Sequence, residues 1–191
     1  STLLNQGALE VRLDLPYPAL NNNAWVGDFS KPCNDQDNQV EFRQADACRL
    51  DVRRTLDVTV YHAALQWSAG GRVESRGNRV RLIPQGVDTL ELSLAFAPDA
   101  FDTALPGFAD TRSAAARHWE EFWLSGGAID LSASRNPRWR ELERRVVLSQ
   151  YQMAAQSAGS WPSAEAGLMG LDPWRGQFHM EMTWWHLAHY T

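Results

Sequence analysis

The sequence predicts an α+β protein, with an antiparallel β-sandwich portion first and a helical part after it. Up to about Ala97, short runs alternate apolar and polar residues, as half-buried strands do. After Asp110 the apolar residues recur instead at the spacing of helices. The length of 191 residues allows one ordinary domain or two small ones.

Five alternating runs are expected to form strands, and turn residues separate them. The runs are Ala8–Leu15, Gln39–Arg43, Leu56–Leu65, Arg79–Ile83 and Thr89–Phe96. The turn signals are Asn21-Asn22-Asn23, Gly70-Gly71, Gly77-Asn78 and Pro84-Gln85-Gly86. The polar, irregular segment Ala24–Asn38 is expected to be a long loop. Short strands at this spacing favour an antiparallel sandwich or part of one.

Three helices are expected in the second part. Asp110–Leu124 opens on an aspartate or threonine N-cap and stops at Gly126-Gly127, before a short extended stretch, Ala128–Leu131. Asn136-Pro137 predicts the start of a second helix, which runs to about Ala158. Its packed face is expected to hold Trp139, Leu142, Val146, Ser149, Gln150 and Met153. After a loop rich in Gly, Pro and Trp, Gln177–Tyr190 reads as a third helix.

Composition excludes several classes of protein. Eighteen basic against 23 acidic residues give a net charge of −5, which argues against a general nucleic-acid binder. The sequence has no run of about 18 apolar residues, so no membrane span is expected. Cys33 and Cys48 flank a polar stretch; a disulfide between them is left open, and they lack further metal ligands nearby. We expect no cofactor.

The segment Trp174–Tyr190 (WRGQFHMEMTWWHLAHY) concentrates chemistry, with three histidines, three tryptophans, an arginine and a glutamate. One interpretation is a buried amphipathic helix with satisfied histidines. The other is a face turned to a ligand, because a stripe of Glu and His beside Trp would otherwise leave polar groups unpaired. Zinc is a weaker alternative: His179, His186 and His189 are spaced to supply two ligands, but HExxH is absent. A Gly-x-Ser-x-Gly elbow and a phosphate-binding glycine loop are absent too.

Carbohydrate fits these residues better. A pyranose has an apolar face that stacks on Trp and hydroxyls that need Glu, Asp, His, Arg and Gln partners. Glycoside hydrolysis also needs two placed carboxyl groups, and Glu165, Asp172 and Glu181 are the candidates near this region. Of these, Glu181 lies between His179 and Trp184, where burial and a neighbouring ring are expected to shift its pKa.

The stretch Glu141–Tyr190, with ELERRVVLSQYQMAAQSAGSWPSAEAGL and then WRGQFHMEMTWWHLAHY, resembles the entry into the catalytic barrel of six-hairpin (α/α-barrel) glycosidases. The resemblance implies a β-sandwich over residues 1–107, a helical linker over 108–135 and the start of an α/α-barrel catalytic domain over 136–191. Because such a barrel needs twelve helices, this chain is expected to be a truncated, inactive portion of a glycoside hydrolase.

The same resemblance implies that a sugar cleft is lined by Trp174, Arg175, His179, Trp184, Trp185 and His186. Glu181 is the catalytic candidate, although family members usually take the general acid from a later helix or loop. The implied partners are a carbohydrate substrate and the remainder of the barrel or a second chain, with neither nucleic acid nor membrane. The alternatives are a non-catalytic carbohydrate-binding module and a protein-interaction module.

Overall fold

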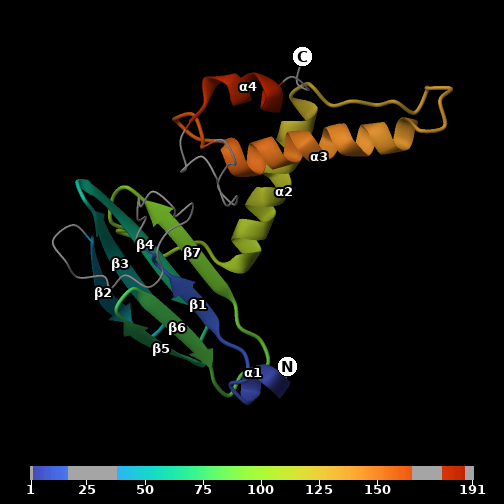
Figure 1. Ribbon diagram of the computed structural model, residues 1–191. Coiled ribbons are helices and arrows are strands. Elements are labelled where there is room, and N and C mark those ends of the chain that lie inside the picture. Colours follow the sequence, from blue (N-terminus) through green and yellow to red (C-terminus); the bar gives the residue numbers. More distant parts are fainter. Residues whose placement is uncertain (1, 17–37, 165–177, 188–191) are drawn as a thin grey trace. The chain divides into compact units, whose positions relative to one another are not determined.

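The computed structural model describes residues 2–16, 38–164 and 178–187 (Figure 1). Over these residues the chain forms seven strands in two antiparallel sheets, together with four helices. The predicted α+β class with antiparallel sheets is therefore confirmed, and the barrel remains a prediction. The chain divides into two compact units, with the boundary between Ala115 and Ala116, inside a helix.

The first unit holds both sheets. The smaller has the strand order β1-β6-β5: β1 (Val11–Asp14), β6 (Arg79–Pro84) and β5 (Gly71–Arg76). The larger has the order β2-β3-β4-β7: β2 (Asn38–Asp46), β3 (Arg49–Leu56), β4 (Thr59–Trp67) and β7 (Leu92–Ala97). Consecutive strands β2, β3 and β4 pair as hairpins, and β5 and β6 form another.

One hydrophobic core joins the two sheets. Val52, Leu65 and Trp67 of the four-stranded sheet belong to the same buried cluster as Val80 and Leu82 of the three-stranded sheet. The inner faces therefore pack on each other, as in a sandwich. The core placement of Trp67 also removes one of the nine tryptophans from consideration as a binding residue.

Two strands were missed by the sequence pattern, and one predicted strand was wrong in its bounds. The run Leu56–Leu65 crosses a hairpin, because β3 ends at Leu56 and β4 begins at Thr59, with Asp57 at a positive φ of 50° in the turn. In β3 the inward positions hold Leu50, Val52 and then the fully buried Arg54, whose charge interrupts the apolar alternation. In β5 the pattern is obscured because Gly71, predicted as a turn residue, is the first residue of the strand.

The helices are α1 (Thr2–Asn5), α2 (Phe108–Leu124), α3 (Trp139–Ser157) and α4 (Met180–Leu187). Helix α2 starts two residues before the predicted cap, so Asp110 lies in its first turn. Before α3, the Asn136 side chain accepts a hydrogen bond from the Arg138 N–H at 2.9 Å, and the helix starts only at Trp139. Leu142 is exposed and so does not belong to the packed face, where Gln150 is buried.

In the second unit, α2 and α3 contact each other through aromatic and amide side chains. The rings of Trp119 and Tyr151 lie 4.9 Å apart between centroids. The buried Gln150 donates from Nε2 to the carbonyl oxygen of Gly127 at 2.8 Å, which fixes the turn after α2. The Glu143 carboxylate similarly accepts from the Leu131 N–H at 2.7 Å. Polar side chains of α3 thus hold the connection between the two helices.

Candidate functional site

Helix α4 places three of the predicted site residues on one side. Glu181 lies in its first turn, and Trp184 and Trp185 follow three and four residues later. Residues at these spacings are neighbours on a helix surface. Both indoles are largely exposed, 67% for Trp184 and 64% for Trp185, and Glu181 is exposed as well. The burial expected for Glu181 is therefore wrong.

Two further apolar side chains at the start of α4 are exposed. Phe178 is 42% exposed, and Met180 at the start of the helix is 79% exposed. His179 is half-buried, and its carbonyl oxygen accepts the Met182 N–H at 3.1 Å, which closes the first turn. His179 therefore has a structural role at the start of α4 in addition to its predicted place in the site.

Part of the predicted site lies outside the described residues. Trp174 and Arg175 are there, and so are the carboxylate candidates Glu165 and Asp172. His186 belongs to α4, but its side chain is not described. Among the described residues, the predicted site therefore consists of the Glu181 carboxylate, the indoles of Trp184 and Trp185, and the half-buried His179.

The described tryptophans outside α4 divide into packed and exposed residues. Trp119 is half-buried, with its ring 5.4 Å from that of Phe122 in α2 and near Tyr151 of α3. Trp123 and Trp139 are half-buried as well. Trp161 is 85% exposed and was not singled out from the sequence. Its position in the Gly159–Pro162 turn region was the available signal, because an aromatic residue there has few neighbours to pack against.

One of the two cysteines lies among the described residues. Cys48 is a half-buried free thiol, and Cys33 lies outside the described residues, so the disulfide between them stays open. Within the described ranges, His, Cys, Asp and Glu do not gather in any group of three that could hold a metal ion. Across the same ranges, every helix is too short or too polar to span a bilayer.

A cavity on the four-stranded sheet is lined by none of the residues that the sequence analysis singled out. It has a volume of about 440 Å³, and its lining includes Arg53, His62 and Phe101. The signal that could have indicated it is the set of charged residues at outward positions of β2 and β3. Sequence alone did not show which positions those were, because β3 was missed.

Comparisons of the sequence with protein-family models, with curated proteins and with solved structures find no match. The resemblance to six-hairpin glycosidases therefore stays a prediction.

Proposed function

We propose that this chain contributes sugar-binding residues to a glycoside hydrolase that acts on oligo- or polysaccharides. The observation that supports the proposal is the pair of exposed indoles, Trp184 and Trp185, beside the exposed carboxylate of Glu181 on α4. The second support is the resemblance of residues 141–190 to the entry of a six-hairpin glycosidase barrel.

The combination of side chains suits a sugar better than it suits a purely apolar ligand. Two exposed indoles leave a large apolar area in water, and each square ångström covered is worth roughly 25 cal/mol. The apolar face of a pyranose can cover such a ring. Its hydroxyl groups then need hydrogen-bond partners at the edge, and the Glu181 carboxylate can accept from two of them.

We assign Glu181 to binding substrate hydroxyl groups and not to proton transfer. A carboxyl group that acts as a general acid at neutral pH is usually shielded from water or set beside a second carboxylate. Glu181 is exposed. Hydrolysis requires two carboxyl groups, roughly 5–5.5 Å apart in retaining enzymes and 6.5–9.5 Å apart in inverting ones. The second group would have to come from residues such as Glu165 or Asp172, or from elsewhere in the protein.

Titration calorimetry with maltoheptaose, cellopentaose and xylopentaose tests the binding step. Trp184→Ala and Glu181→Gln should each raise the dissociation constant for the bound oligosaccharide about tenfold and leave the melting temperature unchanged. Trp161→Ala is the matched control, because it removes an exposed indole outside α4. An equal loss of affinity in Trp161→Ala, or a large drop in melting temperature in Glu181→Gln, would contradict the assignment.

Product analysis on the same oligosaccharides, carried out with the complete enzyme to which this chain is expected to belong, tests the reaction. New reducing ends that decrease in Glu181→Gln would support hydrolysis. Binding without cleavage would instead identify a carbohydrate-binding module.

The exposed apolar side chains of Phe178 and Met180 favour a protein-docking module as the second candidate, since a contiguous apolar surface is common at interaction sites. Sedimentation analysis that shows self-association, lost in Met180→Ser, together with no sugar binding, would select that candidate.

A further inference from the structure

One face of the four-stranded sheet points away from the core and carries charged side chains. Val52 and Ala63 belong to the core, so their neighbours in β3 and β4 face outward, because side chains alternate along a strand. The register of the sheet places Glu41, Arg53 and His62 in one row across β2, β3 and β4.

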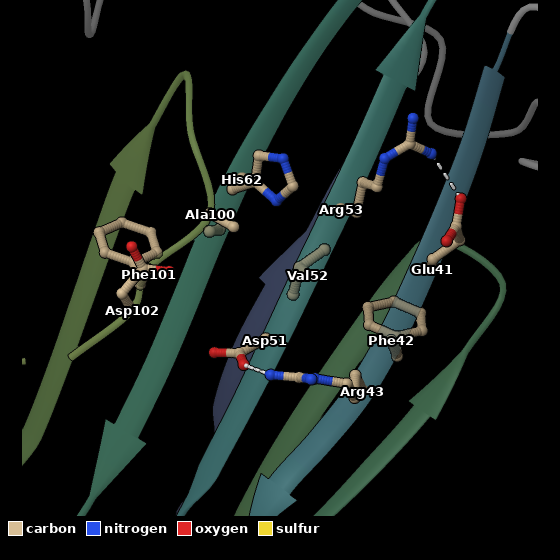
Figure 2. Close-up of a pocket in the computed structure, with 11 residues that line it drawn as sticks. Glu41, Phe42, Arg43, Asp51, Val52, Arg53, His62, Ala100, Phe101 and Asp102 are labelled. Atoms are coloured by element: carbon tan, nitrogen blue, oxygen red, sulfur yellow. Dashed lines mark hydrogen bonds and ion pairs between the residues drawn. The ribbon is translucent and has the colours of Figure 1, made fainter. Parts of the chain in front are cut away.

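Two ion pairs join neighbouring strands on this outward face (Figure 2). Arg53 donates from Nη1 to Glu41 Oε1 at 2.6 Å, and Arg43 donates from Nη2 to Asp51 Oδ2 at 3.1 Å. A guanidinium has five N–H groups and a carboxylate about four lone pairs. Each pair therefore keeps donors and acceptors that a ligand can use, at positions fixed by the strands.

The chain between β7 and α2 folds back to form a wall beside these pairs. The buried Arg49 bonds Asp51 Oδ1 at 2.8 Å and the carbonyl oxygens of Phe101 and Thr103 at 3.1 and 2.6 Å. These bonds hold the returning segment over the sheet. Figure 2 shows Ala100 and Phe101 on one side of His62 and the Arg53 side chain on the other.

The resulting cavity of about 440 Å³ is nearly neutral. Its lining contains the carboxylates of Glu41, Asp51 and Asp102 and the guanidinium groups of Arg43 and Arg53. Arg49 lies outside the lining, but its guanidinium pairs with the Asp51 carboxylate at 2.8 Å and so adds a third positive charge beside the cavity. Three positive and three negative charges therefore cancel. A site for phosphate or nucleic acid would carry an excess of positive charge.

We propose that this cavity is a second carbohydrate-binding site, which holds one or two sugar units of a neutral oligosaccharide. Its volume falls within the range of ligand pockets, roughly 300–1,000 Å³. The paired donors and acceptors match vicinal hydroxyl groups, which donate and accept at once. Phe101 gives the lining an aromatic side chain for the apolar side of a sugar ring. The choice of carbohydrate among neutral polar ligands rests on the proposed function.

Residue-resolved NMR of the ¹⁵N-labelled chain tests this site. Maltoheptaose, cellopentaose and xylopentaose are titrated in turn, with inorganic phosphate as the anionic probe. At least one oligosaccharide should shift the backbone amides of His62, Phe101 and Asp102. Arg53→Met should then raise the dissociation constant measured from these amide shifts at least fivefold. Phe101→Ala should do the same, because it leaves intact the backbone carbonyl that Arg49 binds.

Arg72→Met is the matched control for Arg53→Met. Arg72 also pairs with one carboxylate, that of Glu74, and is similarly exposed, but it belongs to the three-stranded sheet. An equal effect of Arg72→Met, shifts caused by phosphate alone, or silent cavity amides would each overturn the proposal. Shifts confined to Trp184 and Trp185 would overturn it while supporting the proposed function. Shifts confined to the cavity would support it and count against the assignment of α4.

Discussion

The side chain of Gln66 pairs with both backbone polar groups of Leu105. Gln66 Oε1 accepts from the Leu105 N–H at 2.9 Å, and Gln66 Nε2 donates to the Leu105 carbonyl oxygen at 3.3 Å. The side-chain amide of Gln66 thus satisfies the backbone N–H and C=O of Leu105, as a neighbouring strand would. Together with Arg49, it fastens the segment between β7 and α2 onto the outward face of β3 and β4.

Replacing this amide should destabilise the β unit. Gln66→Glu keeps the size of the side chain but removes the donor to Leu105, and Leu105 is buried, so an orphaned carbonyl there costs about 1–3 kcal/mol. Urea unfolding measures the loss. Gln85→Glu, at an exposed turn position, should change the free energy of unfolding by less than about 0.5 kcal/mol. Equal effects of the two substitutions would show that the Gln66–Leu105 pair contributes little.

The turn before β5 requires glycine at position 70. Gly70 has a φ of +88°, and a Cβ there would lie 2.2 Å from Val87 Cγ1 and 3.0 Å from the carbonyl oxygen of Gln85. We expect Gly70→Ala to lower the free energy of unfolding by about 2–4 kcal/mol, through backbone strain and overpacking together. Gly77→Ala is the comparison, since Gly77 also has a positive φ but open space around it. Its cost should stay near 1 kcal/mol, and a reversed order would contradict the geometry.

The acid response of α3 follows from Glu141. Hydrogen bonds from Arg144 and then Arg145 hold the pKa of Glu141 at about 2, below its ordinary 4.5. Because the folded-state pKa is lowered, the stabilisation is complete above pH 4.5 and is lost as the pH falls toward 2. The Glu141 side-chain carboxyl resonance should therefore remain in its ionised position at pH 3. Arg144→Gln should raise the titration midpoint, and a wild-type midpoint near 4.5 would refute the pairing.

The sequence predicted the β part wherever apolar side chains alternate on the inward positions. It failed at β3 because Arg54 occupies an inward position there. Arg54 donates to the carbonyl oxygen of Pro16, 38 residues earlier in the chain. A buried charge with so distant a partner leaves no local pattern. The bounds of β4 were missed for the related reason that the hairpin at Asp57 lacks a glycine.

The candidate site was predictable to the extent that it depends on helical spacing. Glu181, Trp184 and Trp185 share a side of α4 because of their positions alone. Exposure was harder to predict, because it depends on packing against other parts of the chain: Glu181 was expected to be buried and is exposed. The cavity on the four-stranded sheet depends on Arg49 binding backbone more than 50 residues later in the sequence, which no local pattern encodes.

Two tryptophans of the helical unit should differ sharply in their effect on stability. Trp119 packs against Phe122, Trp123 and Tyr151, so Trp119→Ala should lower the free energy of unfolding by about 2–4 kcal/mol. Trp184 is mostly exposed, and Trp184→Ala should change it by less than about 0.5 kcal/mol. Thermal denaturation compares the two variants. A large loss of unfolding free energy in Trp184→Ala would instead indicate that Trp184 packs in the interior.

The most direct test of sugar binding by α4 is the set of indole N–H resonances during an oligosaccharide titration. The resonances are assigned by single Trp→Phe substitutions, and maltoheptaose, cellopentaose and xylopentaose are added in turn. We predict that one of these sugars shifts the Nε1–H signals of Trp184 and Trp185 with a common dissociation constant, while the signals of Trp67 and Trp119 stay unchanged. Unmoved signals of Trp184 and Trp185 at saturating concentrations of all three sugars would contradict it.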